Sequence, residues 1–306
     1  FLAAFIKGVD EYQDFSQLFL SVVLAIRRIN PGVKLFVVGD DWQAINRFAG
    51  SDVEYFKRFE KYFDEDVRRL TIGTNYRSSR KIVDGARGFM QKAMNERGEF
   101  RANQRKYGQV IVVEPRNTAY EHALVEYDRR INPKDYIYKQ IVWRMMGREP
   151  KKKTVRYMKT VIEVIKQNLK MKEILLLHRN NETNLEGITL DGIVRGLKWG
   201  FDKLGILSAE DFDEKIQIMT MHKSKGLEAE VVIILEADEG VIPKTHPDTR
   251  LYEIFGETEE TSIDDQKRLF YVAMTRAKKK LYIIHDSATG GGFVKFLGNG
   301  VKRWGE

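Results

Sequence analysis

Short apolar runs alternate with longer amphipathic segments along the whole chain. Several runs are unbroken and rich in β-branched residues, such as Val231–Leu235, which is typical of strands buried on both faces of a parallel sheet. Because such runs alternate with segments of helical periodicity, the pattern predicts an α/β fold with parallel sheets. The predicted strands are 6–9, 34–38, 69–72, 110–114, 173–177, 217–219, 231–235 and 280–284, and the predicted helices are 16–29, 53–62, 79–95, 119–131, 154–169, 190–204 and 264–278.

Length and composition allow two packed domains and exclude some classes of site. The chain has 306 residues, 42% of them hydrophobic, and no cysteine, which excludes disulfides and thiolate metal sites and fits a reducing cell interior. It has no apolar run of about 18 residues, so we expect no membrane span and no membrane partner. It begins with Phe1 and shows no signal peptide, and we expect it to be part of a longer protein.

The net charge of +8 favours a polyanionic partner, and it is unevenly distributed. Lys151–Lys172 holds eight basic residues against the single acid Glu163. Within this segment, the helix predicted over 154–169 has one apolar stripe and a basic remainder. It fits either an amphipathic surface helix with a solvated basic face or a track for a nucleic-acid phosphate backbone.

The first motif with chemical potential is Val9–Asp14, where two adjacent carboxylates follow a short strand. Asp10 can hold a phosphate-bound Mg²⁺, usually through water, and Glu11 can orient or deprotonate an attacking water molecule. Taken alone, the dipeptide also fits a strand end with two solvated acids.

The second motif is Val38–Ile45, directly after a predicted strand. Gly39 permits a tight turn, and Gln43 lies at the carboxyl end of the strand, the usual ligand edge of a parallel sheet. Gln43 can therefore lie near a γ-phosphate or its neighbouring water. Phe48 and Trp42 are candidates for base stacking, although either ring could equally belong to the core.

The third motif is Asn75–Ser79. Tyr76 offers a flat ring for a purine, and Arg77 offers a charged fork for a phosphate. Its serines are also good N-caps for the helix that follows, so without its context the motif reads as a capped turn.

The fourth motif, Ile218–Glu228, places hydroxyl, imidazole and ammonium groups after a strand. Glu228 could accept a hydrogen bond from a ribose hydroxyl. The residues that could contact a nucleic-acid backbone are Thr220, His222, Ser224 and Lys225.

The fifth motif is Arg268–Lys278, in which an apolar helix stripe carries Arg276 close to the predicted end of the helix. An arginine in this position can act as an arginine finger in phosphoryl transfer.

In this order, the five motifs resemble motifs II, III, IV, V and VI of UvrD/Rep-like superfamily 1 DNA helicases, and the second is closest to the helicase IV branch. The fourth and fifth are long and specific, and the five cover nearly the whole chain. The resemblance implies two RecA-like cores of the P-loop NTPase class, with ATP between them and single-stranded DNA across their tops. The residues that carry it are Asp10–Asp14, Gly39–Gln43, Asn75–Ser78, Thr220–Glu228 and Tyr271–Lys278.

The resemblance also implies roles for the nucleotide site. Asp10 would bind Mg²⁺, Glu11 would be the catalytic base and Gln43 would sense the γ-phosphate. From the second core, Tyr76 would stack on adenine and Glu228 would contact the ribose. The residues expected to reach the γ-phosphate from that core are Arg77 and Arg276.

For the DNA site, the resemblance implies that Thr220 and His222 touch the backbone and that Phe48 stacks on a base. Two positions depart from the family, because Asn46 stands where relatives often carry Tyr and Ala49 where they often carry Arg. Since base stacking is worth about 1–3 kcal/mol per base, the grip on DNA could be altered.

The largest departure is the phosphate loop. The family's G-x-x-x-x-G-K-[ST] motif holds the β- and γ-phosphates, but the chain contains no Gly-Lys dipeptide. We therefore expect the first core to be incomplete at its N-terminus, with the missing part of the same protein as a partner, although true loss of ATPase activity is the alternative. The chain alone is expected to bind nucleotide poorly and to be inactive.

The expected division is the end of the first core over residues 1–74 and the second core over 75–306. Any accessory insertion in the second core should be small or absent, with Pro133–Lys153 as its vestige or replacement.

The function expected from the resemblance is that of an ATP-dependent helicase or translocase on single-stranded or partly duplex DNA. Its 3′-to-5′ polarity and its location, the bacterial-type cytoplasm with nucleoid association, are implied in the same way. One alternative is a non-catalytic nucleic-acid-binding or regulatory module, which the missing loop favours and the retained Glu11 and Arg276 oppose. Another is a motor that remodels a protein, which would need protein-binding arms that are not evident.

Overall fold

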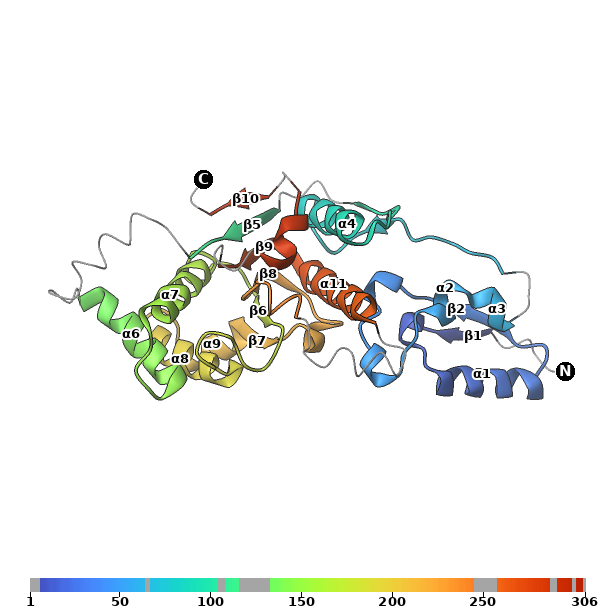
Figure 1. Ribbon diagram of the computed structural model, residues 1–306, viewed down its shortest axis with the longest axis horizontal. Coiled ribbons are helices and arrows are strands. Elements are labelled where there is room, and N and C mark those ends of the chain that lie inside the picture. Colours follow the sequence, from blue (N-terminus) through green and yellow to red (C-terminus); the bar gives the residue numbers. More distant parts are fainter. Residues whose placement is uncertain are drawn as a thin grey trace.

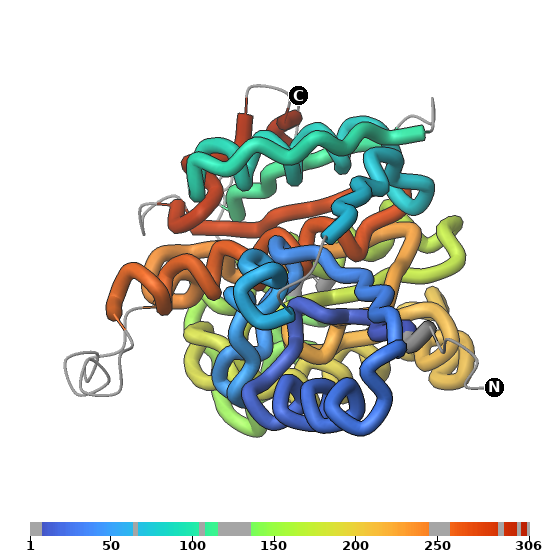
Figure 2. The backbone as a smooth tube through the Cα atoms, turned by 90° about the vertical axis from the view of Figure 1, so that its right-hand side faces the viewer, coloured from blue at the N-terminus to red at the C-terminus, as the bar shows by residue number. Residues whose placement is uncertain are grey.

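The computed structural model describes residues 6–63, 67–103, 108–115, 133–244, 258–286, 291–298 and 301–304. These residues form a small N-terminal lobe and a larger lobe around a parallel sheet, with α11 (Glu259–Thr275) reaching from the larger lobe to the smaller one (Figure 1). Viewed from the side of the small lobe, the blue N-terminal segment lies in front of the strands and teal α4 (Arg80–Met94) runs above it (Figure 2). The end of α11 that points away from the sheet therefore lies next to the small lobe.

The small lobe is built on two parallel strands, β1 (Ile6–Val9) and β2 (Lys34–Val37). They are connected by α1 (Gln17–Ile29), whose first turn is capped by the hydroxyl of Ser16. Two short helices, α2 (Glu54–Lys57) and α3 (Phe59–Phe63), complete the lobe. Its buried core consists of Tyr12, Phe15, Leu20, Tyr55 and Phe63.

The larger lobe contains a six-stranded sheet in the order β10-β5-β9-β8-β6-β7, and each neighbouring pair is parallel. This confirms the predicted α/β class. The strands are β5 (Gln109–Val113), β6 (Ile174–His178), β7 (Ile216–Thr220), β8 (Ala229–Ile234), β9 (Ala277–Ile284) and β10 (Lys302–Arg303).

Helices cover both faces of this sheet, as Figure 1 shows. One face packs on α4 and α11, and the other on α6 (Pro133–Met146), α7 (Lys152–Gln167), α8 (Leu190–Lys203) and α9 (Ala209–Lys215). In β8, Val231 and Ile233 pack on the face covered by α6 to α9, while Val232 and Ile234 pack on the face covered by α4 and α11. Successive side chains of a strand point to opposite faces, so a strand covered on both sides needs the unbroken apolar run seen in the sequence.

Most predicted elements are confirmed, with small shifts at their ends. The strand predicted over 69–72 is wrong, because this segment is irregular and its apolar side chains Leu70 and Ile72 are exposed. A two-residue pair, β3 (Thr74–Asn75) with β4 (Arg101–Ala102), forms nearby instead. The helix predicted over 119–131 lies outside the described residues.

Three helical segments differ from the prediction. The helix expected over 53–62 is divided into α2 and α3, since Arg58 leaves the helical conformation. The helix expected over 264–278 begins earlier, where Thr258 and Thr261 form a capping box, and ends at Thr275 because β9 follows at once. Helices α6 and α9 were not predicted.

Helix α6 lies in the segment where we expected a vestigial insertion. It packs against α8, and its residues Tyr138, Ile141 and Val142 are part of the buried core. The division of the chain at residue 75 stays a prediction.

Glycines of α8 allow the close contact with α6. A Cβ at Gly196 would lie 2.3 Å from Met145 Cγ and 2.8 Å from the carbonyl oxygen of Ile141. Backbone atoms cannot move aside as a flexible side chain can, so only glycine fits at this position.

We expect Gly196→Ala to lower the free energy of unfolding by about 1–3 kcal/mol, since overpacking a close interface costs this much. The matched control is Gly88→Ala in α4, where a new Cβ would meet nothing within 4 Å. That change should stabilise the chain by about 0.5–1 kcal/mol through helix propensity alone. Urea unfolding of both variants checks the prediction, and a stabilised Gly196→Ala would contradict it.

Candidate active site between the two lobes

The carboxyl end of β1 turns sharply at the first motif. Glu11 has a left-handed backbone conformation, with φ 53°, and its amide donates to Asp10 Oδ1 at 2.8 Å. Gln13 Nε2 donates to Glu11 Oε2 at 2.5 Å, and Gln13 Oε1 accepts from the amide of Asp40 at 3.0 Å. A non-glycine residue in this conformation is costly and is common at functional sites. The strained turn leaves both carboxylates of the dipeptide exposed.

The second motif packs directly against this turn. A Cβ at Gly39 would lie 2.8 Å from Gln13 Oε1, so glycine is needed here for close approach. The next residue, Asp40, accepts from Gln43 Nε2 at 2.6 Å. Burial raises the pKa of Asp40, and the nearby charges of Asp41 and Glu11 act in the same direction. Gln43 is thus held by a carboxylate at the carboxyl end of β2.

Arg276 reaches this group from the other lobe. It follows the last turn of α11 and is almost fully buried, with Nε donating to the carbonyl of Val272 at 2.9 Å. Its Nη2 donates to Gln43 Oε1 at 3.3 Å and its Nη1 to the carbonyl of Leu227 at 3.3 Å. Gln43 therefore connects Asp40 in one lobe to Arg276 in the other.

A second guanidinium lies close to the first. Burial lowers the pKa of Arg276 to about 10, and the positive charge of Arg77 contributes to the same shift. Arg77 Nε donates to Glu228 Oε2 at 2.7 Å, and Lys278 Nζ contacts the other oxygen of Glu228 at 2.7 Å. These partners, Lys278 first, lower the pKa of Glu228. Two neighbouring cations facing exposed carboxylates form a site suited to an anion such as a phosphate.

The residues present fit the γ-phosphate end of a Mg²⁺-nucleotide. Within the described part of the chain, no three acidic or histidine side chains are grouped to hold a metal ion alone. Mg²⁺ is commonly held by one or two carboxylates together with phosphates and water, and Asp10 can supply such a ligand. Tyr76, expected to stack on adenine, has 65% of its surface exposed.

Lys225 does not point toward the expected DNA surface. Its Nζ lies 2.5 Å from Asp14 Oδ2 and 3.5 Å from Glu11 Oε2, and it donates to the carbonyl of Gln43 at 3.2 Å. Its ammonium group therefore bridges the two lobes, and the space around this bridge and Arg276 is called the cleft below. Sequence reasoning missed this role, and it did not single out Asp14 or Gln13.

Two of the expected DNA contacts, Phe48 and His222, lie together, and the surface around them is called the rim of the cleft. Phe48, 77% exposed, meets the ring of His222 edge-on at a centroid distance of 5.5 Å. Thr220 is largely buried beside them, at the end of β7. Ser224 is fully buried and its hydroxyl donates to the carbonyl of Met221 at 2.6 Å, so in this conformation it is turned away from the surface, and its contact with DNA stays a prediction.

Arg179 is a further cation at this rim. It follows β6, next to the end of β7, and its charge contributes to the lowered pKa of His222. Burial lowers its own pKa, and its buried Nε finds no hydrogen-bond partner among the described residues. Its position directly after the apolar strand 174–178 could have identified it.

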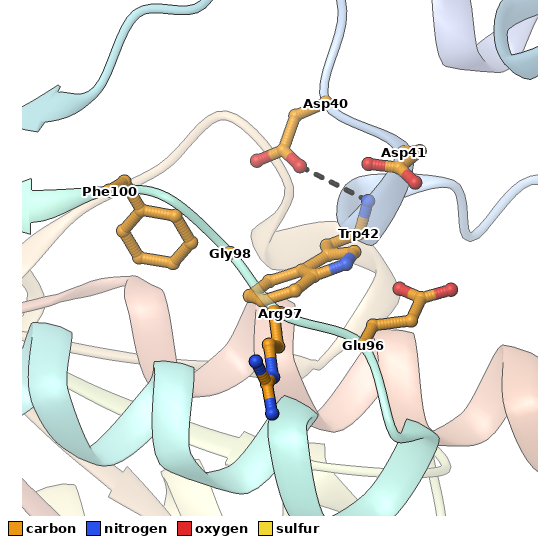
Figure 3. A pocket seen from close by; sticks show the side chains of 7 residues that line it. All are labelled: Asp40, Asp41, Trp42, Glu96, Arg97, Gly98 and Phe100. Atoms are coloured by element: carbon orange, nitrogen blue, oxygen red, sulfur yellow. Dashed lines mark hydrogen bonds between the residues drawn. The ribbon is translucent and has the colours of Figure 1, made fainter.

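Trp42 belongs to the core and is excluded as a stacking platform. Its ring is buried and lies edge-on to Phe100 at 5.4 Å and to Tyr271 at 5.3 Å. Figure 3 shows it lining a cavity of about 350 Å³ between the second motif and residues 96–100. Gly98 passes so close that a Cβ there would lie 2.6 Å from the indole.

Two family profiles match the chain. Residues 8–64 match the UvrD/REP helicase N-terminal domain, and residues 201–288 match the UvrD-like helicase C-terminal domain. The first profile covers the Asp10 and Gln43 motifs, and the second covers the Thr220–Glu228 and Arg276 motifs. Within the described residues, no helix is both long and apolar enough to cross a membrane.

Individual relatives agree with the profiles. DNA helicase IV of Escherichia coli is 25% identical over 95% of this chain and 35% of its own length. A probable DNA helicase of Mycoplasma pneumoniae is 25% identical over 91% of this chain and 43% of its length. The putative ATP-dependent DNA helicase YjcD of Bacillus subtilis is 44% identical over 22% of this chain and 8% of its length. The chain thus spans less than half the length of these relatives.

The stability of the chain should depend on pH through His222. Burial, assisted by the charge of Arg179, lowers the pKa of His222 to about 4 from an ordinary value of 6.5. Between these values, the unfolded chain binds a proton that the folded chain excludes. The free energy of unfolding should therefore fall as pH falls from 6.5 toward 4, and it should fall less steeply in His222→Gln.

Urea unfolding at several pH values within this window measures the slope. The neighbouring exposed residue supplies the control, since Lys223→Gln should keep the wild-type slope. Equal slopes in wild type and His222→Gln would contradict the assignment.

Proposed function

Because the chain belongs to the UvrD/Rep-like superfamily 1 helicases, we propose that it supplies the interlobe site of an ATP-dependent DNA helicase or translocase. The observation that carries the proposal is the contact from Arg276 to Gln43 across the cleft, at 3.3 Å. This contact brings the candidate γ-phosphate sensor of the small lobe, Gln43, next to the candidate arginine finger of the larger lobe, Arg276. The substrate is single-stranded or partly duplex DNA, and the polarity is 3′ to 5′.

In this proposal, each lobe contributes a different part of the site. Asp10 holds Mg²⁺, and Glu11 accepts a proton from the attacking water. Gln43 orients the water or the γ-phosphate, while Arg77 and Arg276 neutralise the charge that develops on the transferred group. The bound nucleotide supplies the phosphoanhydride bond whose hydrolysis drives the cycle.

The adjoining residues bind the rest of the nucleotide. Tyr76 stacks on adenine, and Glu228 accepts from the ribose once it exchanges part of its pairing with Arg77. Arg77 is then available to the phosphate. The present pair between Arg77 and Glu228, at 2.7 Å, is exposed to solvent, so its exchange costs little.

The DNA site lies on the rim, with Phe48 as the stacking platform and Thr220 and His222 at the backbone. Arg179 adds a charged contact there. Cleft closure on ATP and opening after hydrolysis would shift the lobes and move bases past Phe48. Lys225 couples the nucleotide site to the DNA site, because the same short motif carries His222 beside Phe48 and Lys225 beside Asp14 and Glu11.

The proposal includes a further part of the same protein that covers α1 and supplies the phosphate loop. Apolar side chains on the outer side of the small lobe support this, since contiguous exposed apolar surface marks an interface. They are Leu18, Phe19, Val22, Ile26, Ile29 and Phe36.

The test is DNA-stimulated ATPase activity of the chain joined to its upstream coding sequence, beside the chain alone. Arg276→Ala in the longer form should lower kcat by at least about 10³-fold, since an arginine finger is worth this much. Affinity for single-stranded DNA should stay unchanged. Arg276→Lys should also be impaired, because it keeps the charge and loses the planar fork.

The control is Arg303→Ala on β10, an exposed residue, which should retain full activity. Circular dichroism checks that the Arg276 variants fold. Near wild-type hydrolysis by folded Arg276→Ala would reject the assignment, and absence of activity in both forms of the wild-type chain would favour a non-catalytic nucleic-acid-binding module.

Lys225 should affect ATP turnover and leave DNA affinity unchanged. Lys225→Ala removes the bridge to Asp14 and Glu11, and an interlobe coupling of this kind is typically worth 1–3 kcal/mol. We expect kcat/KM for ATP to fall by about tenfold, while the affinity for single-stranded DNA stays at the wild-type value. Lys223→Ala, on the exposed side of the same turn, is the control. A loss of DNA affinity equal to that of His222→Ala would restore Lys225 to the DNA site.

A further inference from the structure

The net charge of the chain resides in one segment remote from the cleft. Residues 133–172 contain twelve Lys and Arg against three Asp and Glu, a net charge of +9. The chain as a whole carries +8, so all other residues together carry −1. This segment forms α6 and α7, at the end of the molecule opposite the small lobe (Figure 1).

Helix α6 presents aromatic side chains to solvent from the middle of this charge. Tyr136 and Trp143 are 48% and 47% exposed, and the exposed Lys139 lies between them. The spacing of three and four residues places all three on one side of the helix. The opposite side, with Ile141 and Val142, is buried in the core. The exposed rings are therefore not required to fix the helix in place.

The aromatic and cationic surface continues onto α8. The guanidinium of Arg144 lies 4.3 Å from the ring centroid of Trp199. An exposed arginine that lies over an indole presents a delocalised cation at the surface. Stacking rings beside cations are the combination that binds single-stranded nucleic acid without regard to sequence.

The turn from α6 to α7 is attached to the loop that follows β6. Arg148 Nη2 donates to the carbonyl of Glu186 at 2.8 Å, and the amide of Lys151 donates to its carboxylate at 2.8 Å. The same loop begins with Arg179 at the rim of the cleft. The basic turn and the candidate DNA rim are thus parts of one continuous edge.

The first turn of α7 lies over the carboxyl edge of the sheet. Lys153 Nζ is 2.9 Å from Asp286 Oδ2, just after β9, and the hydroxyl of Tyr157 accepts from the amide of Glu236 at 2.6 Å, just after β8. Parallel strands end at the same edge, and Thr220 ends β7 there. A strand of DNA that follows this edge from the rim would reach the basic turn.

We propose that Tyr136, Lys139, Trp143 and Lys151–Lys153 form a second contact surface for single-stranded DNA. The phosphates lie along the basic turn, and bases stack on the two exposed rings. This inference rests on the proposed function only for the identity of the ligand, DNA, because binding at this surface needs neither ATP nor unwinding. Its consequence is a longer footprint on the strand than the rim alone would give.

Trp143 fluorescence reports on this surface directly in the 306-residue chain. Titration with a long oligo(dT) should quench the emission, and the quench should be clearly smaller in Trp143→Phe, because Trp143 is exposed whereas Trp42 is buried and Trp199 and Trp304 are half-buried. Tyr136→Ala with Trp143→Ala should weaken binding of the long oligonucleotide by at least about tenfold, since each stacked base is worth about 1–3 kcal/mol. A short oligo(dT), filling the rim alone, should bind the variant as it binds wild type.

Charge reversal tests the basic turn against a matched control. Lys151→Glu with Lys152→Glu should weaken binding of the long oligonucleotide and reduce the slope of log Kd against log salt by about one per lost phosphate contact. Lys170→Glu with Lys172→Glu makes the same change of charge at the other end of α7, near the opposite edge of the sheet. Those variants should keep nearly wild-type affinity and slope.

Equal losses in the two charge-reversal pairs would overturn the proposal, because net charge alone would then explain them. Unchanged quenching in Trp143→Phe, or wild-type binding of the long oligonucleotide by the aromatic double variant, would overturn it as well. His222→Ala separates this failure from that of the proposed function. If wild type binds DNA through His222 and the α6 variants bind equally well, only the second surface is rejected; if wild type binds no DNA, the proposed function fails first.

Discussion

The site between the lobes depends on Arg276, a buried cation that has no carboxylate in contact among the residues that the structure describes. The hydrogen bonds of Arg276 go to neutral oxygens, among them the carbonyls of Val272 and Leu227 and the side chain of Gln43. These acceptors orient the guanidinium and do not cancel its charge, so its attraction for an anion persists in a medium of low dielectric. Since Arg276 joins the end of α11 to the start of β9, its position is set by the core of the larger lobe.

The parallel sheet separates the two chemistries of the site. Glu228 and Arg276 precede β8 and β9 and lie at the amino edge, whereas Thr220 ends β7 and Arg179 follows β6 at the carboxyl edge. The segment from 220 to 228 crosses from one edge to the other and carries Lys225 between them. A shift of the small lobe that moves the partners of Lys225 must therefore act on the same short segment that carries His222.

The sequence was sufficient for the sheet and for the residue types in the cleft, because both are encoded locally. Buried parallel strands require unbroken apolar runs, and the carboxylates and arginines stand in recognisable motifs. The directions of Ser224 and Lys225 were not predictable, since a tight turn set by tertiary contacts turns one inward and the other across the cleft. Helix α6 was missed because Tyr136 and Trp143 put apolar rings on its solvent side and hide its periodicity.

The exposed aromatic rings of α6 distinguish it from α1, which also has exposed apolar side chains. The outer side of α1 is mainly aliphatic, with Leu18, Val22 and Ile29, and its basic residues are confined to the last turn. Aliphatic surface gains from burial against protein, which suits a covering domain. On α6 the exposed groups are aromatic and lie among lysines. Rings can stack on bases while the ammonium groups meet phosphates, so two exposed apolar surfaces of one chain call for chemically different partners.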